Sequence, residues 1–92
     1  MTQREKKIVV LGRRDHAEAM RVAAGLTIFG HDVQLVLMDR AVEDTPENRK
    51  QAELLELAEI EPQTTVAGSE LPHLSAGALA ELMTACEVIL SI

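Results

Sequence analysis

A continuous aliphatic run near the start of the chain limits most strongly what the chain can fold into. After Lys7, residues 8–11 (IVVL) contain no polar residue, which is typical of a strand buried on both faces of a parallel sheet. Further strands are predicted at 33–38 (VQLVLM), 63–67 (QTTVA) and 87–92 (EVILSI), with helical patterns between them. Helices between strands imply parallel pairing through right-handed crossovers. The sequence therefore predicts an α/β fold of order βαβαβαβ, with a single small doubly wound parallel sheet in a flavodoxin-like three-layer α/β/α arrangement.

Helix start and stop signals mark the segments between the strands. We predict helices over residues 17–29 and 47–59 and from residue 75 onward. The predicted N-caps are Asp15, Thr45 and Ser75, whose side chains can accept hydrogen bonds from free backbone N–H groups. Glu18 follows Asp15 at nearly capping-box spacing, and Gly30 suits the position just after the first helix. The second helix is expected to bury a stripe made of Ala52, Leu54, Leu55, Leu57 and Ala58.

The predicted helix over residues 17–29 is apolar around nearly all of its circumference. After Ala19, its only charged residue is Arg21. A helix with this pattern is buried on more than one side. Three helices cannot cover both faces of a four-stranded sheet equally, and we expect one face to carry only this first helix. Together with open edge strands, this predicts self-association. The alternative is a longer native domain in which a further strand covers the edge.

Composition and charge indicate one domain over residues 1–92 and limit the kinds of partner that it is expected to bind. The chain has one aromatic residue, Phe29, and a formal net charge of −6. Stacking on nucleic-acid bases needs aromatic side chains and phosphate binding needs clustered Lys and Arg, so we expect no nucleic-acid partner. No apolar stretch reaches the roughly 20 residues that span a bilayer, so we expect no membrane insertion. The single cysteine cannot form an internal disulfide, which favours a cytoplasmic location.

Polar residues follow the predicted strands at the carboxyl edge of the sheet, where open α/β sheets bind ligands. The predicted ligand-binding residues are Gly12, Arg13, Arg14, Asp15, Arg40, Ser69 and His73. Arg13 and Arg14 precede a helix N-terminus, where the helix dipole and free N–H groups favour a small anion. The alternative is that both arginines are solvated or pair with Asp15 and the acidic surface.

The sequence contains no complete cofactor, metal or catalytic motif. Only Gly12 of a G-x-G-x-x-G fingerprint follows the first strand, and the P-loop pattern is absent, so we expect no cofactor. His16, His31 and His73 lack metal-ligand spacing and are interpreted as surface or capping residues, with no metal.

Cys86 is the one candidate nucleophile. A reactive thiol needs a helix N-terminus or basic neighbours, whereas Cys86 lies late in the third predicted helix and precedes Glu87. Both features disfavour the thiolate, so we favour a buried structural cysteine and no enzymatic activity.

Two segments of the chain resemble the DsrE/DsrF-like family. Residues 17–42 (AEAMRVAAGLTIFGHDVQLVLMDRAV) combine an alanine-rich helix, a Gly-His-Asp turn, an aliphatic strand and a loop ending in Ala-Val. Residues 79–92 (LAELMTACEVILSI) are similar to the end of that family's domain. The resemblance implies a small flavodoxin-like protein that assembles into dimers, trimers or hexamers. It also implies a place in sulfur relay, in which some members carry persulfide sulfur on a cysteine after the third strand.

The segment that matches the family's active loop, residues 66–69 (VAGS), contains no cysteine. The resemblance therefore implies an accessory or partner subunit in sulfur metabolism, which forms a homo-oligomer or joins related DsrE/DsrF-type subunits. Two alternatives stay open at this point. One is a module that binds a small anionic ligand through Arg13, Arg14 and Arg40, and the other is a sulfurtransferase that uses Cys86.

Overall fold

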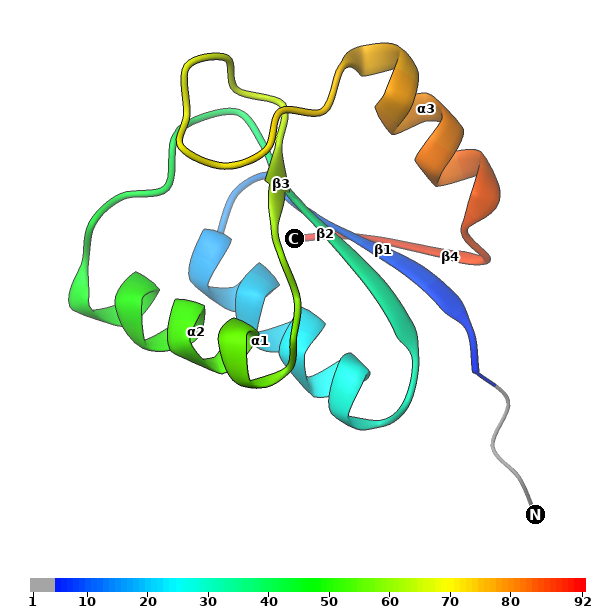
Figure 1. Ribbon diagram of the computed structural model, residues 1–92, viewed down its shortest axis with the longest axis horizontal. Helices are drawn as coiled ribbons and strands as arrows, with labels where there is room; N and C mark the ends of the chain where they lie inside the picture. Colours follow the sequence, from blue (N-terminus) through cyan, green and yellow to red (C-terminus); the bar gives the residue numbers. More distant parts are fainter. Residues whose placement is uncertain (1–4) are drawn as a thin grey trace.

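The computed structural model describes residues 5–92, in which four strands and three helices alternate along the chain (Figure 1). The strands are β1 (Lys7–Gly12), β2 (Asp32–Leu37), β3 (Gln63–Thr64) and β4 (Val88–Ser91), and the helices are α1 (His16–Ile28), α2 (Pro46–Leu57) and α3 (Ala76–Ala85). All strand pairs are parallel, and the order across the sheet is β3-β2-β1-β4. The predicted α/β class is confirmed, and the arrangement is compatible with a flavodoxin-like doubly wound fold.

Each helix begins at the N-cap that the sequence predicts. The side chains of Asp15, Thr45 and Ser75 accept hydrogen bonds from the backbone N–H groups three residues later, at 3.0, 3.1 and 3.1 Å. The capping box at α1 is only half formed, because the Glu18 carboxylate pairs with Arg21. Gly30 ends α1 as predicted, with φ of 96°.

Strand β3 ends at Thr64, where the chain leaves the sheet, and is therefore shorter than the predicted 63–67. The Thr64 hydroxyl donates to the carbonyl oxygen of Leu37 at 2.8 Å and accepts the N–H of Val66 at 3.0 Å. The backbone of Thr64 bonds to Pro72 and Leu74 on its other side. Residues 65–71 therefore form a loop that is closed at its base.

Helices α1 and α2 cover one face of the sheet, and α3 alone covers the other (Figure 1). The right-handed crossover rule explains this division. The chain moves in one direction across the sheet from β1 to β2 to β3, and then returns past both strands to β4. The prediction that the first helix alone covers one face is therefore wrong, because α3 is the unaccompanied helix.

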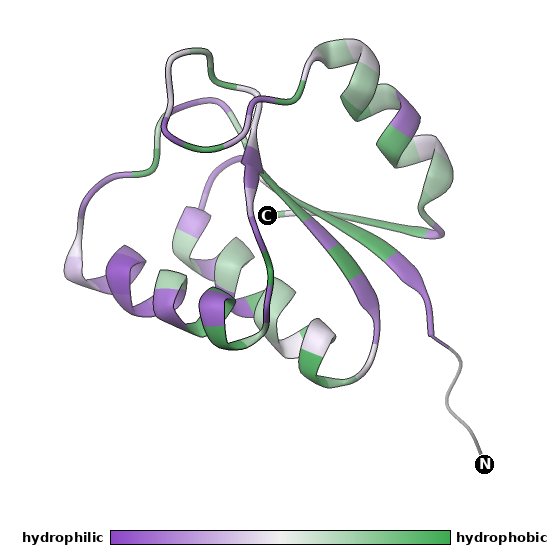
Figure 2. Ribbon diagram, viewed as in Figure 1, coloured by the Kyte–Doolittle hydropathy of each residue, from purple (hydrophilic) through white to green (hydrophobic). Residues whose placement is uncertain are grey.

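Side-chain alternation along the strands divides the core into two layers. On the face covered by α1 and α2, buried strand residues meet buried helix residues; these are Ile8, Val10, Leu35 and Leu37 against Ala19, Met20, Ala23, Ala24 and Leu55. On the α3 face, Val9, Leu11 and Val36 are buried, but α3 itself contributes no buried residue. Helix α3 is nevertheless mainly hydrophobic, whereas α2 is mainly hydrophilic (Figure 2). The α3 face is the thinner half of the core.

Large apolar residues at the ends of α1 and α2 are exposed, among them Leu57, which the sequence places in the buried stripe of α2. Ile28 and Phe29, in and after the last turn of α1, are 76% and 71% exposed, and Leu57 of α2 is 83% exposed. The buried stripe of α2 is limited to Leu55 with the half-buried Leu54 and Ala58, and Ala52 is exposed. At 3.6 residues per turn, Leu57 lies about 200° around the helix from Leu55, which turns it away from the sheet.

Candidate functional site

Gly12 positions the start of α1 against β2. A Cβ added at Gly12 would lie 2.8 Å from Cδ2 of Leu37 and 3.0 Å from Cβ of Ala19. Both neighbours belong to the packed core, so neither can withdraw freely. Gly12 is therefore needed for this close approach, which gives it a packing role at the carboxyl end of β1.

The crevice between β1 and β4 is bridged by the chain itself. In this strand order the crossover direction reverses between these two strands, which is where open α/β sheets place ligands. Here the backbone N–H groups of Arg13 and Arg14 both donate to the main-chain oxygen of Ile92, at 2.8 and 2.9 Å. These two donors are consequently satisfied within the protein.

Two of the predicted anion-binding arginines are engaged within the protein. The guanidinium of Arg40 donates to the carbonyl oxygens of Arg14 at 2.7 Å and Arg13 at 3.4 Å. Nε of Arg13 lies 3.9 Å from Oδ2 of Asp39, and both side chains are about half exposed. This agrees with the alternative in which the arginines pair with acidic residues, although the partner of Arg13 is Asp39 rather than Asp15.

His16 is buried, with 3% of its surface exposed, so its interpretation as a surface or capping residue is wrong. As the first residue of α1 it turns toward the end of β2, where Nε2 lies 3.0 Å from the carbonyl oxygen of Met38. A carbonyl only accepts, so Nε2 carries the proton. His31 is half-buried, and its Nδ1 accepts from the N–H of Lys6 at 3.1 Å. His73 is exposed and pairs through its backbone with Thr64.

The predicted ligand-binding residues do not converge on one site. Arg14, Asp15 and Arg40 line a cleft of about 290 Å³ between the N-termini of α1 and α2, together with His16. Ser69 lines a different cleft, and His73 lines neither of them. The carboxyl edge therefore carries two hollows, with Glu43 and Asn48 lining both of them, where the sequence predicts one.

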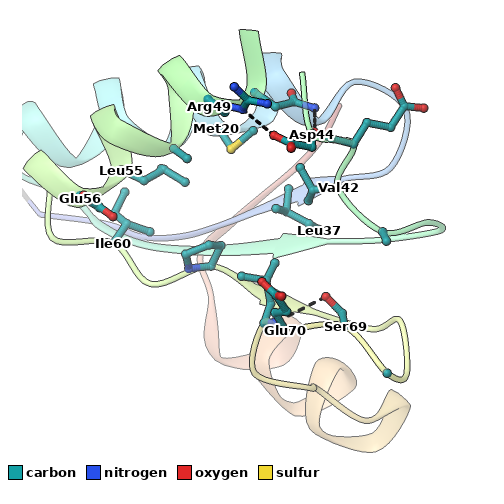
Figure 3. A pocket seen from close by; sticks show the side chains of 17 residues that line it. Met20, Leu37, Val42, Asp44, Arg49, Leu55, Glu56, Ile60, Ser69 and Glu70 are labelled. Carbon is teal, nitrogen blue, oxygen red and sulfur yellow. Dashed lines mark hydrogen bonds and ion pairs between the residues drawn. The ribbon is translucent and has the colours of Figure 1, made fainter. Parts of the chain in front are cut away.

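The larger hollow, which we call the β2–β3 cleft, has a volume of about 840 Å³ and lies between α2, the loop after β2 and the 65–71 loop (Figure 3). Its floor is formed by three core residues that are at most 2% exposed, Met20, Leu37 and Leu55. Half-buried apolar residues complete its walls; these are Val42, Ile60, Pro62 and Leu71. Because β3 ends after two residues, no strand covers this part of the core.

Of the residues that line the β2–β3 cleft, the sequence predicts only Ser69 as ligand-binding, because the floor residues have the pattern of ordinary core residues. Leu37 belongs to an aliphatic strand and Leu55 to a helix stripe. Neither pattern indicates that α2 and the 65–71 loop leave a gap above them. The only signal in the sequence is Gly68, Ser69 and Glu70, which follow the third strand.

Carboxylates dominate the rim of the β2–β3 cleft. Glu43, Asp44, Glu56 and Glu70 are exposed there, and Arg49 is the one basic residue among the lining residues. Nε of Arg49 lies 2.5 Å from Oδ1 of Asp44, and this hydrogen bond lowers the pKa of the Asp44 carboxyl. Since Arg49 and Asp44 neutralise each other, the remaining rim is acidic.

Cys86 lies at the amino ends of the strands, whereas both clefts lie at their carboxyl ends. It is the half-buried C-cap of α3, near the first residues of β1 and β2. Burial raises the pKa of the Cys86 thiol, the Asp32 carboxylate adds to the rise, and Lys7 opposes it. The direction agrees with the sequence argument, although burial rather than the helix terminus is the main cause.

These features define a small parallel α/β domain with two hollows at the carboxyl edge of its sheet. Within residues 5–92, no three His, Cys, Asp or Glu side chains form a group that could hold a metal ion. None of the helices in the described range is long and apolar enough to cross a membrane. Comparison of the chain with protein-family models, curated proteins and solved structures gives no match. Membership of the DsrE/DsrF-like family, and the cytoplasmic location, stay predictions.

Proposed function

We propose that this chain is a non-catalytic subunit of DsrE/DsrF-like type that works by assembling with a second copy or a related subunit. The observation that carries the proposal is the exposure of Ile28, Phe29 and Leu57, each more than 70% accessible. Exposed large apolar side chains that gather in one region mark interaction surfaces. All three lie at the ends of α1 and α2, which pack side by side and run in the same direction.

The free edge of β4 supports the same proposal. Among the described residues, β4 pairs only with β1, so one row of its backbone N–H and C=O groups faces away from the sheet. Proteins usually protect such edges with charged residues or proline, and Val88–Ser91 contains neither. Ile89 adds apolar surface beside this edge, with 44% of its area exposed. A further strand in a longer chain would use the same edge.

A non-catalytic role is favoured by what is found at the two positions where a sulfur-carrying cysteine would be expected, the loop after the third strand and Cys86. Residues 66–69 follow the third strand and contain no cysteine, although Gly68 and Ser69 do line the β2–β3 cleft. Cys86 is half-buried, its pKa is raised, and it lies at the amino ends of the strands. A place as accessory or partner subunit in cytoplasmic sulfur metabolism is what the family resemblance adds to this proposal.

The test is the molar mass in solution, measured by light scattering after size-exclusion chromatography over a range of concentrations. We expect an assembly larger than a monomer, and a strict monomer at high concentration would contradict the proposal. Phe29→Lys combined with Leu57→Lys should shift the assembly toward the monomer. Ala80→Lys combined with Ala85→Lys adds the same charge at exposed positions of α3 and is the matched control.

The position of the contact is tested by a second variant. Ile89→Lys places a charge beside the β4 edge and leaves α1 and α2 unchanged. If this variant alone dissociates the assembly, β4 rather than the ends of α1 and α2 forms the contact.

A further inference from the structure

We propose that the β2–β3 cleft binds a small amphiphilic cation, an apolar molecule that ends in a protonated amine. This inference is independent of the proposed assembly. The cleft volume of about 840 Å³ lies within the range of roughly 300–1,000 Å³ that is usual for small-molecule sites. It is also much larger than the cleft beside Arg14 and Arg40, which measures about 290 Å³.

The apolar floor and walls of the cleft together select for an apolar body. Met20 of α1, Leu37 of β2 and Leu55 of α2 meet there, and their side chains are already held by the core. Figure 3 shows these three side chains with Val42 and Ile60 around one hollow. The floor residues are at most 2% exposed, so a hydrocarbon chain in the cleft would cover mainly the half-buried walls, which are Val42, Ile60, Pro62 and Leu71. The floor beneath it is already packed, which lowers the cost of ordering the site.

The 65–71 loop supplies the wall opposite α2. The Ser69 hydroxyl accepts a hydrogen bond from the N–H of Leu71 at 3.3 Å, which turns the loop back on itself. The base of this loop is fixed where Thr64 bonds to residues 72–74. Leu71 therefore packs against the core beside the cleft, while Glu70 stays exposed at the rim.

The rim selects for a positive head group. Among residues 5–92, the carboxylates of Glu43, Glu56 and Glu70 have no ion-pair partner. In Figure 3, Glu56 lies beside Ile60 at one end of the hollow. Glu70 lies near Ser69 on the 65–71 loop, which is drawn below Leu37 in this view. The one basic residue at the rim, Arg49, is bonded to Asp44 and adds no net charge to the pair. An anionic head group would therefore meet unpaired carboxylates, whereas an ammonium group would be attracted to them.

The experiment compares three probes that share one alkyl chain and differ in head-group charge. Octylamine, octanol and octanoate are titrated into the full chain at neutral pH and low ionic strength, with binding followed by calorimetry and by backbone amide shifts. We expect octylamine to bind about tenfold more tightly than octanoate, with octanol between them. The exposed rim predicts that this preference shrinks in 0.5 M salt, where the screening length falls to a few Å.

Charge variants assign the preference to the rim rather than to the net charge of the protein. Glu43→Gln combined with Glu70→Gln should weaken octylamine binding several-fold and leave octanol binding unchanged. Glu53→Gln combined with Glu81→Gln removes the same charge from exposed positions outside the cleft, and should leave all three affinities as they are. Leu71→Asn should weaken all three probes together, because it removes apolar wall.

Four results would overturn the inference. They are octanoate binding as tightly as octylamine, rim and control variants behaving alike, amide shifts mapping away from the 65–71 loop and α2, and no binding of any probe at millimolar concentration. The oligomeric state does not enter this comparison, so a monomeric chain would contradict the proposed assembly and leave the cleft proposal standing.

Discussion

The guanidinium group of Arg40 donates a hydrogen bond to the carbonyl oxygen of Arg14 across 2.7 Å, and so ties the loop after β2 to the loop after β1. A second nitrogen of the same group lies 3.4 Å from the carbonyl oxygen of Arg13. In the sequence, Arg40 has the properties of a ligand for an anion. In the folded chain two of its nitrogens are directed at the protein's own backbone, so Arg40 holds the loops after β1 and β2 together.

This role predicts a stability effect at Arg40 that Arg14 does not share. Arg40→Ala should lower the free energy of unfolding by about 1 kcal/mol, since a charge-assisted bond is lost at an exposed site. Within residues 5–92, no hydrogen bond or ion pair involves the side chain of Arg14, so Arg14→Ala should change stability by less than about 0.5 kcal/mol. Urea denaturation of both variants measures the difference. Equal effects would contradict the assignment.

A substitution at Gly12 tests the close packing at the carboxyl end of β1. Gly12→Ala should destabilise the fold by about 1–3 kcal/mol, because the added methyl would lie 2.8 Å from Leu37 and 3.0 Å from Ala19. Gly25→Ala is the control, since a Cβ there meets nothing within 4 Å. As Gly25 lies inside α1, the control should stabilise by up to about 1 kcal/mol. Thermal melts of the two variants should therefore move in opposite directions.

The parts of the fold that the sequence predicts are those set by local signals. The buried run at β1, the caps at Asp15, Thr45 and Ser75, and the glycine after α1 each depend on residues within one or two turns of each other. Parallel pairing followed from the alternation of strands and helices. These features needed no knowledge of which face each helix covers.

The features that the sequence does not predict depend on contacts between distant segments. His16 is buried because the end of β2 lies above it, 22 residues further along the chain. The main-chain oxygen of Ile92 occupies the N–H groups after β1 only because β4 pairs beside β1. The β2–β3 cleft likewise lies where β3 ends at Thr64, whose hydroxyl donates to the carbonyl oxygen of Leu37, 27 residues earlier in the chain.

The positive φ of Glu59 predicts that a substitution at this position will stabilise the fold. It ends α2 with φ of 59°, in the left-handed region that costs an L-residue roughly 1–2 kcal/mol. The N–H of the next residue, Ile60, bonds to Leu55 at 2.9 Å, which fixes this geometry. Glu59→Gly should raise the free energy of unfolding by about 0.5–1 kcal/mol, part of the gain being offset by the freedom of glycine in the unfolded chain.

The control for this substitution is Glu53→Gly, an identical exchange at an exposed position inside α2. It should lower the free energy of unfolding by about 1 kcal/mol, because glycine is a poor helix former. Urea midpoints that fall for both variants would show that residue 59 is not held in the left-handed region.

The environment of Cys86 predicts how its alkylation depends on pH. Burial and the Asp32 carboxylate both favour the neutral thiol, so the pKa lies above the ordinary value of about 8.5. At pH 8 the folded chain should therefore react with iodoacetamide more slowly than the chain unfolded in urea. Asp32→Asn removes a negative charge that opposes the thiolate, and should lower the pKa. Lys7→Gln removes a positive charge that favours the thiolate, and should raise it.

The full rate–pH profile separates these charge effects from changes in access to the sulfur. A change in access alters the plateau rate at high pH, whereas a change in pKa moves the midpoint of the profile. We expect the midpoint to move down for Asp32→Asn and up for Lys7→Gln. Midpoints that stay in place for both variants would show that neither charge acts on the thiol. A midpoint below about 8.5 in the native chain would contradict the buried setting of Cys86, and would make a sulfur-transfer role at this cysteine more attractive.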